Sequence, residues 1–402
     1  MSVPAKKIDQ TKPESYSPKM PEIASILEMR RRDVNYPETY LLPNKGTKIP
    51  SDVKHYGPAY VPFANEFAQL LDYIGQGYGF IYHGDWCKDR SYTIADILSG
   101  HAMEPAPLLS EEGVDFLWKV SGFSSRRKYY ADPAKGATMS ESEMIEAIQH
   151  ALCTLEQPVI VPQESQWWGS IIVGYKANGK VLVLQHYLPY FVDMENNAQP
   201  QIVDFAEWYK ENTTLVIAGK REKSLSLIEI YREGLRRIRS CFEINIKGER
   251  HHYYDDWEVF LRLSKDDMIT QVKRTGIVPG GDHGPIGEDA DIWNIICHSH
   301  DSTWCDMAER RFYVMNFCRQ AMEYFPEVKE DLQALDDHFM YTNTIMGSQE
   351  DGYGSEIGDP VNPDIFEKPE VRARMADCVR RFREADEKGL GMIEALLSRM
   401  NL

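Results

Sequence analysis

The sequence lacks an excess of positive charge and lacks any long apolar run, and each absence excludes a class of protein. It has 45 Lys and Arg against 62 Asp and Glu, a formal net charge of −17. Nucleic acids and anionic membranes attract a basic face, so neither is expected as the main partner. No apolar run approaches the ~18 residues of a membrane-spanning helix. The first residues also lack the apolar core of a secretory signal.

Cysteine is scarce as well, and its pattern is irregular. Seven cysteines lie scattered over 402 residues, an odd number that is typical of reduced thiols and not of a disulfide framework. We therefore expect a cytoplasmic protein. Hydrophobic residues make up 43% and charged residues 27% of the chain, which is the composition of a folded globular protein.

The pattern of apolar residues divides the chain into three parts. Residues 1–49 are polar and contain several prolines, so we expect an N-terminal arm and an extended loop. Residues 50–221 show helical periodicity first and strand-like runs second, which predicts an α+β domain. Residues 222–402 are mostly helical in pattern, and we expect a C-terminal helical domain that packs on the first one.

Within residues 50–221 the signals for individual elements are clear. A stripe of apolar residues at helical spacing predicts a helix that follows Tyr56. Ser140 and Glu143 predict a capping box at the start of another helix. Asn178–Gly179 indicates a hairpin, because both positions accept a positive φ. The expected elements are helices at 57–74, 92–98 and 140–155 and strands at 158–161, 168–175, 180–184 and 213–218.

Four segments, in this order, resemble the papain-like cysteine peptidase superfamily. HYGPAYVPFANEFAQLLDYIG (55–75) is similar to the nucleophile helix of the bacteriocin-processing peptidases. SYTIADILSGHAM (91–103) is similar to the segment that follows it in the butirosin-biosynthesis acyltransferase-type family. EQPVIVPQESQWWGSIIVGYKANGKVLVL (156–184) resembles the strand pair of the superfamily, and the helical remainder, with YYDDWEVFL and AERRFYVMNFC, resembles the C-terminal region of the butirosin-type group. The resemblance implies a papain-like domain with a small antiparallel sheet, followed by a mostly α-helical domain.

The residues that would hydrolyse peptides in that family are replaced in this chain. The resemblance puts the nucleophilic cysteine at Tyr56, the histidine at Trp168, and the orienting residue at Gln185 or His186. A phenol with a pKa of about 10 cannot replace a thiolate as a nucleophile at neutral pH. The chain is therefore not expected to be a thiol peptidase.

The same cleft still offers groups that bind a small acidic or acyl-bearing ligand. The resemblance places the backbone amides of Gly57, Ala59 and Tyr60 at a helix N-terminus, which stabilises a carboxylate, a phosphate or an oxyanion. Tyr56 and Trp168 would add a phenol and an indole to its walls. We therefore expect the ligand to be bound by five residues: Tyr56, Gly57, Ala59, Tyr60 and Trp168.

Two histidines and one amide complete the predicted site. By resemblance, the turn that carries His101 lies near the cleft, and His186 lies at the end of a strand. With Tyr56 they are the candidate catalytic residues, because a histidine can carry a proton at neutral pH. Gln185 is a further ligand-binding candidate. The alternative interpretation is that Tyr56 and Trp168 fill an inactive cleft.

A second cluster of reactive side chains lies in the C-terminal region. Its members are Cys297, His298, His300 and Cys305. Such residue types can hold zinc or iron, but no second Cys/His pair with clear metal spacing accompanies them. Asp301 or Ser302 can serve as an N-cap. We therefore expect a turn between two helices, with surface histidines and no metal site.

Three further patterns lead to structural expectations. His83, Asp85 and Cys87 are expected in one loop. The Gly- and Asp-rich segments 276–291 and 347–368 are expected to be loops of the kind that form lids or binding sites. The arginines of the final helix are expected on its solvent-facing side; they are Arg372, Arg374, Arg380, Arg381 and Arg383.

The leading hypothesis is a cytoplasmic small-molecule-handling protein of specialised metabolism. It would bind an acyl, amino-acid or peptide-like ligand, free or attached to a carrier, and the resemblance implies acyl transfer as the ancestral chemistry. The first alternative is a non-enzymatic binding or sensor protein. The second is a metal-dependent enzyme that uses the Cys297–Cys305 cluster. The sequence indicates no particular cofactor, and it leaves open the substrate and whether the chain forms a homo-oligomer.

Overall fold

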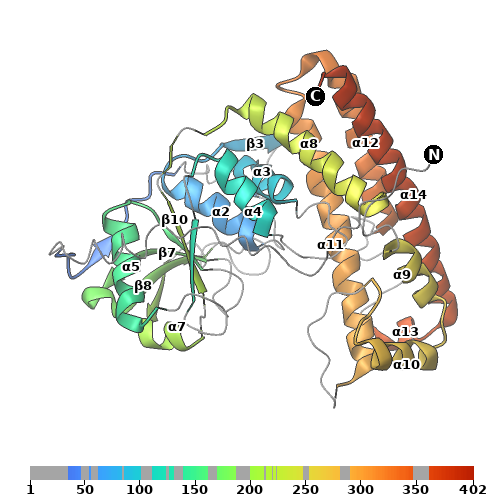
Figure 1. The fold of residues 1–402 in the computed structure, drawn as a ribbon, viewed down its shortest axis with the longest axis horizontal. Helices are drawn as coiled ribbons and strands as arrows, with labels where there is room; N and C mark the ends of the chain where they lie inside the picture. Colours follow the sequence, from blue (N-terminus) through green and yellow to red (C-terminus); the bar gives the residue numbers. More distant parts are fainter. Residues whose placement is uncertain are drawn as a thin grey trace, which may run out of the picture.

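A computed structural model gives the fold as an α+β architecture with two β-sheets and a helical C-terminal region. The sheets lie at one side of the molecule and the longest helices at the other (Figure 1). The structure describes residues 35–46, 54–55, 62–83, 86–100, 111–123, 126–130, 139–161, 170–186, 200–211, 214–219, 221–222, 224–247, 253–280, 290–346 and 362–402.

The larger sheet has seven strands, and all its described pairings are antiparallel. Its strands are β1 (Tyr40–Leu41), β5 (Arg126–Tyr130), β6 (Val159–Val161), β7 (Ser170–Lys176), β8 (Val181–His186), β9 (Gln201–Asp204) and β10 (Thr214–Ala218). They follow the order β5-β10-β6-β7-β8-β9, and β1 pairs with β7. The smaller sheet has the order β2 (Lys54–His55), β4 (Trp86–Asp89), β3 (Phe80–His83).

The centre of the larger sheet is buried. The residues of β7 from Ser170 to Tyr175 are all buried, which requires cover on both faces of the sheet. Two helices, α2 (Pro62–Tyr73) and α5 (Glu141–Cys153), pack on β6 and β7. The predicted capping box at the start of α5 is confirmed, with the Ser140 amide 2.8 Å from a Glu143 carboxylate oxygen. The predicted hairpin is confirmed as well, and Asn178 has a φ of 54°.

One short helix, α3 (Arg90–Ser99), is buried on every side. It ends at Gly100, whose φ of 83° lies in the left-handed region that favours glycine. It packs against α2 and α4 (Glu111–Val120), and also against α8 (Leu227–Ile246) and α11 (Ile292–Ala321). This helix is therefore shared by the sheet region and the helical region (Figure 1).

Polar and aromatic contacts fix α3 against the helical region. The Arg90 guanidinium donates to the Tyr324 hydroxyl at 2.6 Å and to the Glu323 carboxylate at 3.1 Å. The rings of Tyr92 and Tyr313 lie 5.0 Å apart. The first turn of α3 thus contacts both α11 and the turn that follows it.

The helical region contains a second, aromatic-rich core that includes Trp257, Phe260 and Phe366. The remaining helices are α7 (Phe205–Glu211), α9 (Tyr253–Leu261), α10 (Lys265–Thr275), α12 (Lys329–Met346), α13 (Pro363–Phe366) and α14 (Pro369–Arg399). Two 3₁₀ turns, η3 (Ala177–Gly179) and η4 (Pro326–Val328), complete the described elements. Figure 1 shows α11, α12 and α14 packed lengthwise.

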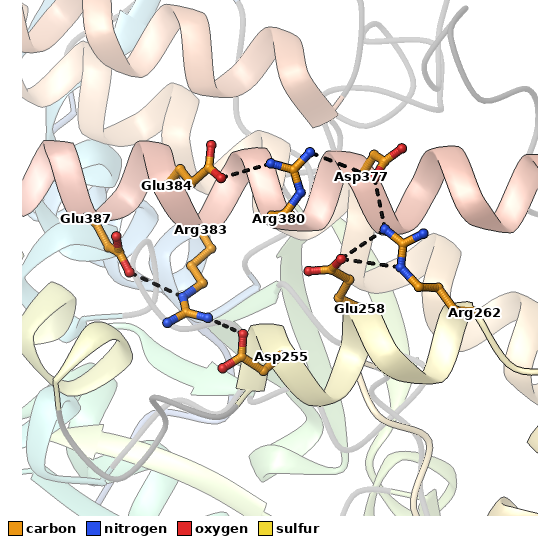
Figure 2. A network of polar contacts seen from close by, with 8 residues as sticks. All are labelled: Asp255, Glu258, Arg262, Asp377, Arg380, Arg383, Glu384 and Glu387. Atoms are coloured by element: carbon orange, nitrogen blue, oxygen red, sulfur yellow. Dashed lines mark hydrogen bonds and ion pairs between the residues drawn. The ribbon is translucent and has the colours of Figure 1, made fainter.

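Ion pairs cross the surface between α9 and α14. Arg262, directly after α9, contacts Asp377 of α14 at 2.9 Å, and Arg383 of α14 contacts Asp255 of α9 (Figure 2). The prediction of a solvent-facing arginine row is wrong for Arg372, which is 2% exposed. Its guanidinium donates to three backbone carbonyl oxygens, which belong to Phe366, Glu367 and Leu263.

Three other expectations about local structure are wrong. His83 and Cys87 lie in β3 and β4, which pair with each other, and not in a loop. The Cys297–Cys305 segment lies inside α11 and not at a turn, because the helix is capped at Asp291 and continues without a break. Part of the expected loop 347–368 is also helical, since α13 lies within it.

Some predicted segments lie outside the described residues. They include residues 1–34, Asp85, and residues 281–289 and 347–361. Within the described part of the chain, no helix combines the length and the apolarity that a bilayer crossing requires.

Candidate functional site

The helices α2 and α3 lie side by side and run in opposite directions. Asp72, near the end of α2, hydrogen-bonds to Asp89, the residue that caps the start of α3. The two helices also pack against each other. Pro62, the first residue of α2, and Gly100, the residue after α3, therefore lie at the same end of the helix pair.

The sheet places the start of β7 toward the end of the helix pair that Pro62 and Gly100 mark. At the opposite end of α2, the Tyr73 hydroxyl donates to the Leu42 carbonyl at 2.9 Å, and the Leu42 amide donates to the Val173 carbonyl at 2.9 Å. The rest of α2 packs across β7 and β6, and β6 pairs with the Ser170–Ile172 part of β7. The start of α2 therefore lies toward Ser170.

Three strand ends meet there. Val161, the last residue of β6, pairs with Ser170, and Ser170 pairs on its other side with His186, the last residue of β8. Together with Pro62 and Gly100, these residues mark the ends of five elements at one side of the α2–sheet interface. This convergence of element ends is the candidate functional site.

Most of the predicted site residues lie just beyond these ends, outside the described residues. They are Tyr56, Gly57, Ala59 and Tyr60 before α2, His101 after Gly100, and Trp168 before Ser170. Gln185 is described: it is half-buried in β8, opposite Ile171. For His186 the structure gives the backbone position in β8. The structure thus brings together the flanks of the predicted residues, and their catalytic and binding roles stay predictions.

Two buried acids within the helix pair are not among the predicted residues. Glu66 of α2 and Asp96 of α3 are both 0% exposed. Glu66 lies six residues before Asp72, and Asp96 lies seven residues after Asp89, so each acid is about 9–11 Å along its own helix from the Asp72–Asp89 contact. Buried acids are costly unless they are hydrogen-bonded or paired, so they are enriched at functional sites.

The sequence contains a signal for these acids. Glu66 lies three residues after Phe63 and four before Leu70, which places it on the same helical face as the apolar stripe. An acid on an apolar face is a stronger indication of a special role than an acid on a solvated face. The periodicity of the apolar residues predicts the helix, but it does not predict that Glu66 is buried in it.

A cation lies at the same end of α3. Arg237 of α8 donates from Nη2 to the Ser99 carbonyl at 3.3 Å. A Cβ atom added to Gly100 or Gly113 would lie 2.7 Å or 2.9 Å from that nitrogen, so both glycines leave room for the guanidinium. Positive charge is favourable at a helix C-terminus. It also places a hydrogen-bond donor close to the residue that precedes His101.

The Cys297–Cys305 cluster presents its described members to different surroundings. Cys297 and His300 are buried in α11, whereas His298 is exposed, and the side chain of Cys305 is outside the described part. The Trp257 indole donates to Nδ1 of His300 at 2.8 Å. The cluster is therefore divided between the aromatic core and the solvent.

Burial leaves the imidazole of His300 neutral and the thiol of Cys297 protonated. Burial lowers the pKa of His300 to about 3 and raises the pKa of Cys297 to about 12. Because Nδ1 of the neutral imidazole accepts a hydrogen bond, its proton is on Nε2. A zinc ion would have to displace the proton of Cys297 and free a lone pair of His300, whose Nδ1 accepts from the Trp257 indole. Among the described residues, no group of three or more His, Cys, Asp and Glu side chains is arranged to hold a metal ion.

Comparisons with known proteins do not assign the chain to a family. No family model matches it, and neither a curated protein nor a solved structure does. The fold and the site therefore define a class by geometry alone: an α+β protein in which the ends of α2, α3 and three central strands surround one candidate site.

Proposed function

We propose that this chain is a small-molecule-handling protein of specialised metabolism on a degenerate papain-like fold. It binds an acyl, amino-acid or peptide-like ligand, free or carrier-bound, at the shared end of α2 and α3. Acyl transfer, or a related reaction without a thiolate, is the chemistry that the resemblance implies. With Tyr56 in place of the nucleophile, the proposal excludes thiol peptidase activity.

One observation carries the proposal. The segments that hold Tyr56–Tyr60, His101, Trp168 and Gln185–His186 are far apart in sequence, and their described flanks meet at one side of the α2–sheet interface. A helix that packs with its start toward an antiparallel strand pair is also what the papain-like resemblance requires. This arrangement supports a single site built from all four segments.

The groups at this site suit a ligand with an apolar body and a polar or charged end. The indole of Trp168 supplies apolar surface, and the free amides at the start of the helix bind an oxyanion or a carboxylate. His101 and His186 are the proton carriers in this proposal, because an ordinary histidine pKa of about 6.5 suits proton transfer at neutral pH.

A non-enzymatic binding or sensor protein is the second candidate. The replacement of both the expected thiol and the expected imidazole, at Tyr56 and Trp168, favours it, because a fold can outlast the chemistry of its site. A ligand held in the site of the full-length protein without turnover would distinguish this candidate. Elemental analysis of the purified protein tests the third hypothesis, a metal enzyme centred on Cys297–Cys305.

Native mass spectrometry of the full-length protein tests the proposal. It measures the mass of any ligand that co-purifies, and that ligand is then the probe for binding to variants. We expect Trp168→Ala to weaken its binding by about 1–3 kcal/mol, the value of one large apolar contact. Trp167→Ala is the matched control, because it removes an identical indole from the neighbouring position of the sequence. His101→Asn should retain the ligand and abolish any turnover.

Two results would contradict the proposal. One is equal loss of binding in the Trp167 and Trp168 variants. The other is a ligand-bound structure in which the ligand lies at His298 and His300 or under residues 276–291, with side chains filling the cleft at Tyr56. Rapid labelling of a single cysteine by a thiol-protease reagent would separately contradict the exclusion of peptidase activity.

A further inference from the structure

A pair of carboxyl groups joins the end of α2 to the start of α3. Asp89 caps α3, with its Oδ1 2.7 Å from the Ser91 amide. Its side chain also hydrogen-bonds to that of Asp72, the penultimate residue of α2. A Cβ atom on Gly77 would overlap Oδ1 of Asp72, so this glycine leaves the space that the carboxyl group occupies. The Tyr78 amide donates to the Ser91 hydroxyl at 2.9 Å and holds the same turn in place.

This hydrogen bond requires a proton. Two ionised carboxylates are acceptors only, so one of the two groups must be protonated. Burial, together with the charge of Asp89, raises the pKa of Asp72 from 3.8 to about 9. Burial also raises the pKa of Asp89, but its hydrogen bonds from Ser91 and Asp72 oppose that rise. Asp72 therefore holds the proton at neutral pH. The Asp89 carboxylate accepts the hydrogen bond from Asp72 and also caps α3.

The nearby described cations are engaged elsewhere and do not neutralise the pair. They lie in three segments near the pair: before α2, at the start of α3 and directly after β10. These cations and their partners are Lys45 with Glu156 (3.1 Å), Arg90 with Glu323 (3.1 Å), and Arg221 with the side chain of Gln76. The phenols of Tyr73 and Tyr78 are further titratable groups in the adjoining segments. Loss of the shared proton would thus leave two adjacent negative charges in a mostly buried place.

We propose that the Asp72–Asp89 pair is a proton-dependent latch, which holds the start of α3 against α2 while the proton is shared and loosens when it is lost. The latch acts on α3, which packs against helices of both the sheet region and the helical region. The other end of that helix carries Gly100, a flank of the candidate site. The position of that flank is therefore expected to depend on pH, whether or not the proposed ligand is correct.

The direction of the pH dependence follows from the proton count. Between about pH 4 and pH 9 the folded chain holds a proton on Asp72 that the unfolded chain releases. Folded-state stability from this group is complete at low pH and is lost progressively as the pH rises to about 9. One such proton changes the folding equilibrium by up to about tenfold per pH unit.

Urea unfolding of full-length Asp72→Asn and wild type, from pH 5 to pH 9, tests the latch. The asparagine amide can donate to Asp89 without a titrating proton. We therefore expect the ratio of folded to unfolded protein to rise in the variant relative to wild type, by up to about tenfold for each unit of pH increase. Hydrogen exchange at each pH should show less protection of the start of α3 in wild type than in the variant at pH 9, and equal protection at pH 5.

The control is Asp204→Asn. Asp204 caps a helix as Asp89 does, accepting from the Ala206 amide at 2.9 Å, but it is exposed. Its substitution should leave the pH profile of wild type unchanged above pH 5. Should Asp72→Asn fail to fold, Asp89→Asn replaces it, because its side chain can still cap α3 and donate to Asp72. Parallel profiles for wild type and the Asp72 variant, or an equal change in the Asp204 variant, would overturn the proposal.

Discussion

The two regions of the molecule bury an acid in opposite ways. In the helical region, the Asp386 carboxylate accepts from Nε and Nη2 of Arg311, at 3.1 Å and 2.7 Å, and from the Tyr254 hydroxyl at 2.7 Å. In the sheet region, Asp89 has a second acid, Asp72, as a side-chain partner. The first acid is compensated by a permanent cation and the second by a proton. Only the second arrangement is expected to respond to pH in the neutral and alkaline range.

The compensated acid sits at the centre of the helical region. Asp386 and Arg311 have side chains that are 0% and 1% exposed. The guanidinium also lies over the rings of Phe242 and Phe382, at 5.2 Å and 4.9 Å. Although burial opposes the charge, the attraction of Asp386 raises the pKa of Arg311. One charge pair therefore connects α8, α9, α11 and α14.

Truncation of the chain after Gly219 should have the largest effect, because it separates the sheet region from the helical region. It removes α8 and α11, which cover α3, and so exposes a helix whose residues are all buried in the whole chain. We expect the fragment to be insoluble or molten, with no cooperative unfolding transition by circular dichroism. A cooperative, monomeric fragment would show that the sheet region does not need the helical one.

Among single substitutions, Asp386→Ala should have the largest effect. It leaves the buried Arg311 charge without the Asp386 carboxylate, which costs about 3–5 kcal/mol of the free energy of unfolding. Glu384→Ala is the control in the same helix, because Glu384 pairs with Arg380 at 2.9 Å on the exposed side (Figure 2). Exposed pairs contribute about 0.3–0.5 kcal/mol. Equal losses in the two variants by urea unfolding would contradict the central role of Asp386.

Tyr254→Phe should have a smaller effect that does not change with pH. Burial, and then the charge of Asp386, raise the pKa of Tyr254 well above 10, so its hydroxyl stays a donor across the neutral and alkaline range. Loss of one hydrogen bond to a charged group costs about 1.5 kcal/mol when two other donors remain. The unfolding free energies at pH 7 and pH 9 should differ from wild type by the same amount. A loss that shrinks at pH 9 would indicate that the phenol ionises.

The sequence is sufficient to predict the elements that local rules determine. The capping box at Ser140 and the hairpin at Asn178 each depend on residues within one or two turns. The α+β class and the helical C-terminal region follow from the change of period in the same way. Short strands such as β3 and β4 escape such rules, because their pairing depends on partners and not on a pattern.

The buried polar groups cannot be predicted in this way, because their partners are distant in sequence. The pattern puts Arg372 in solvent, yet it caps the ends of neighbouring segments through backbone carbonyls, including that of Leu263. The hydrogen bond between Asp72 and Asp89 joins a helix end to a strand end. For the candidate site, the sequence names Tyr56, Trp168 and the histidines, and the structure adds the meeting of their flanks.

Infrared spectroscopy of the carboxyl groups tests the contrast between the two buried acids most directly. At neutral pH, the difference spectrum between wild type and Asp72→Asn should show the carbonyl band of a protonated carboxylic acid, and the difference spectrum between wild type and Asp386→Asn should not. The band should also fade as the pH rises through about 9, where Asp72 loses its proton. An unchanged spectrum in the Asp72 variant, or loss of the band in the Asp386 variant, would contradict the account.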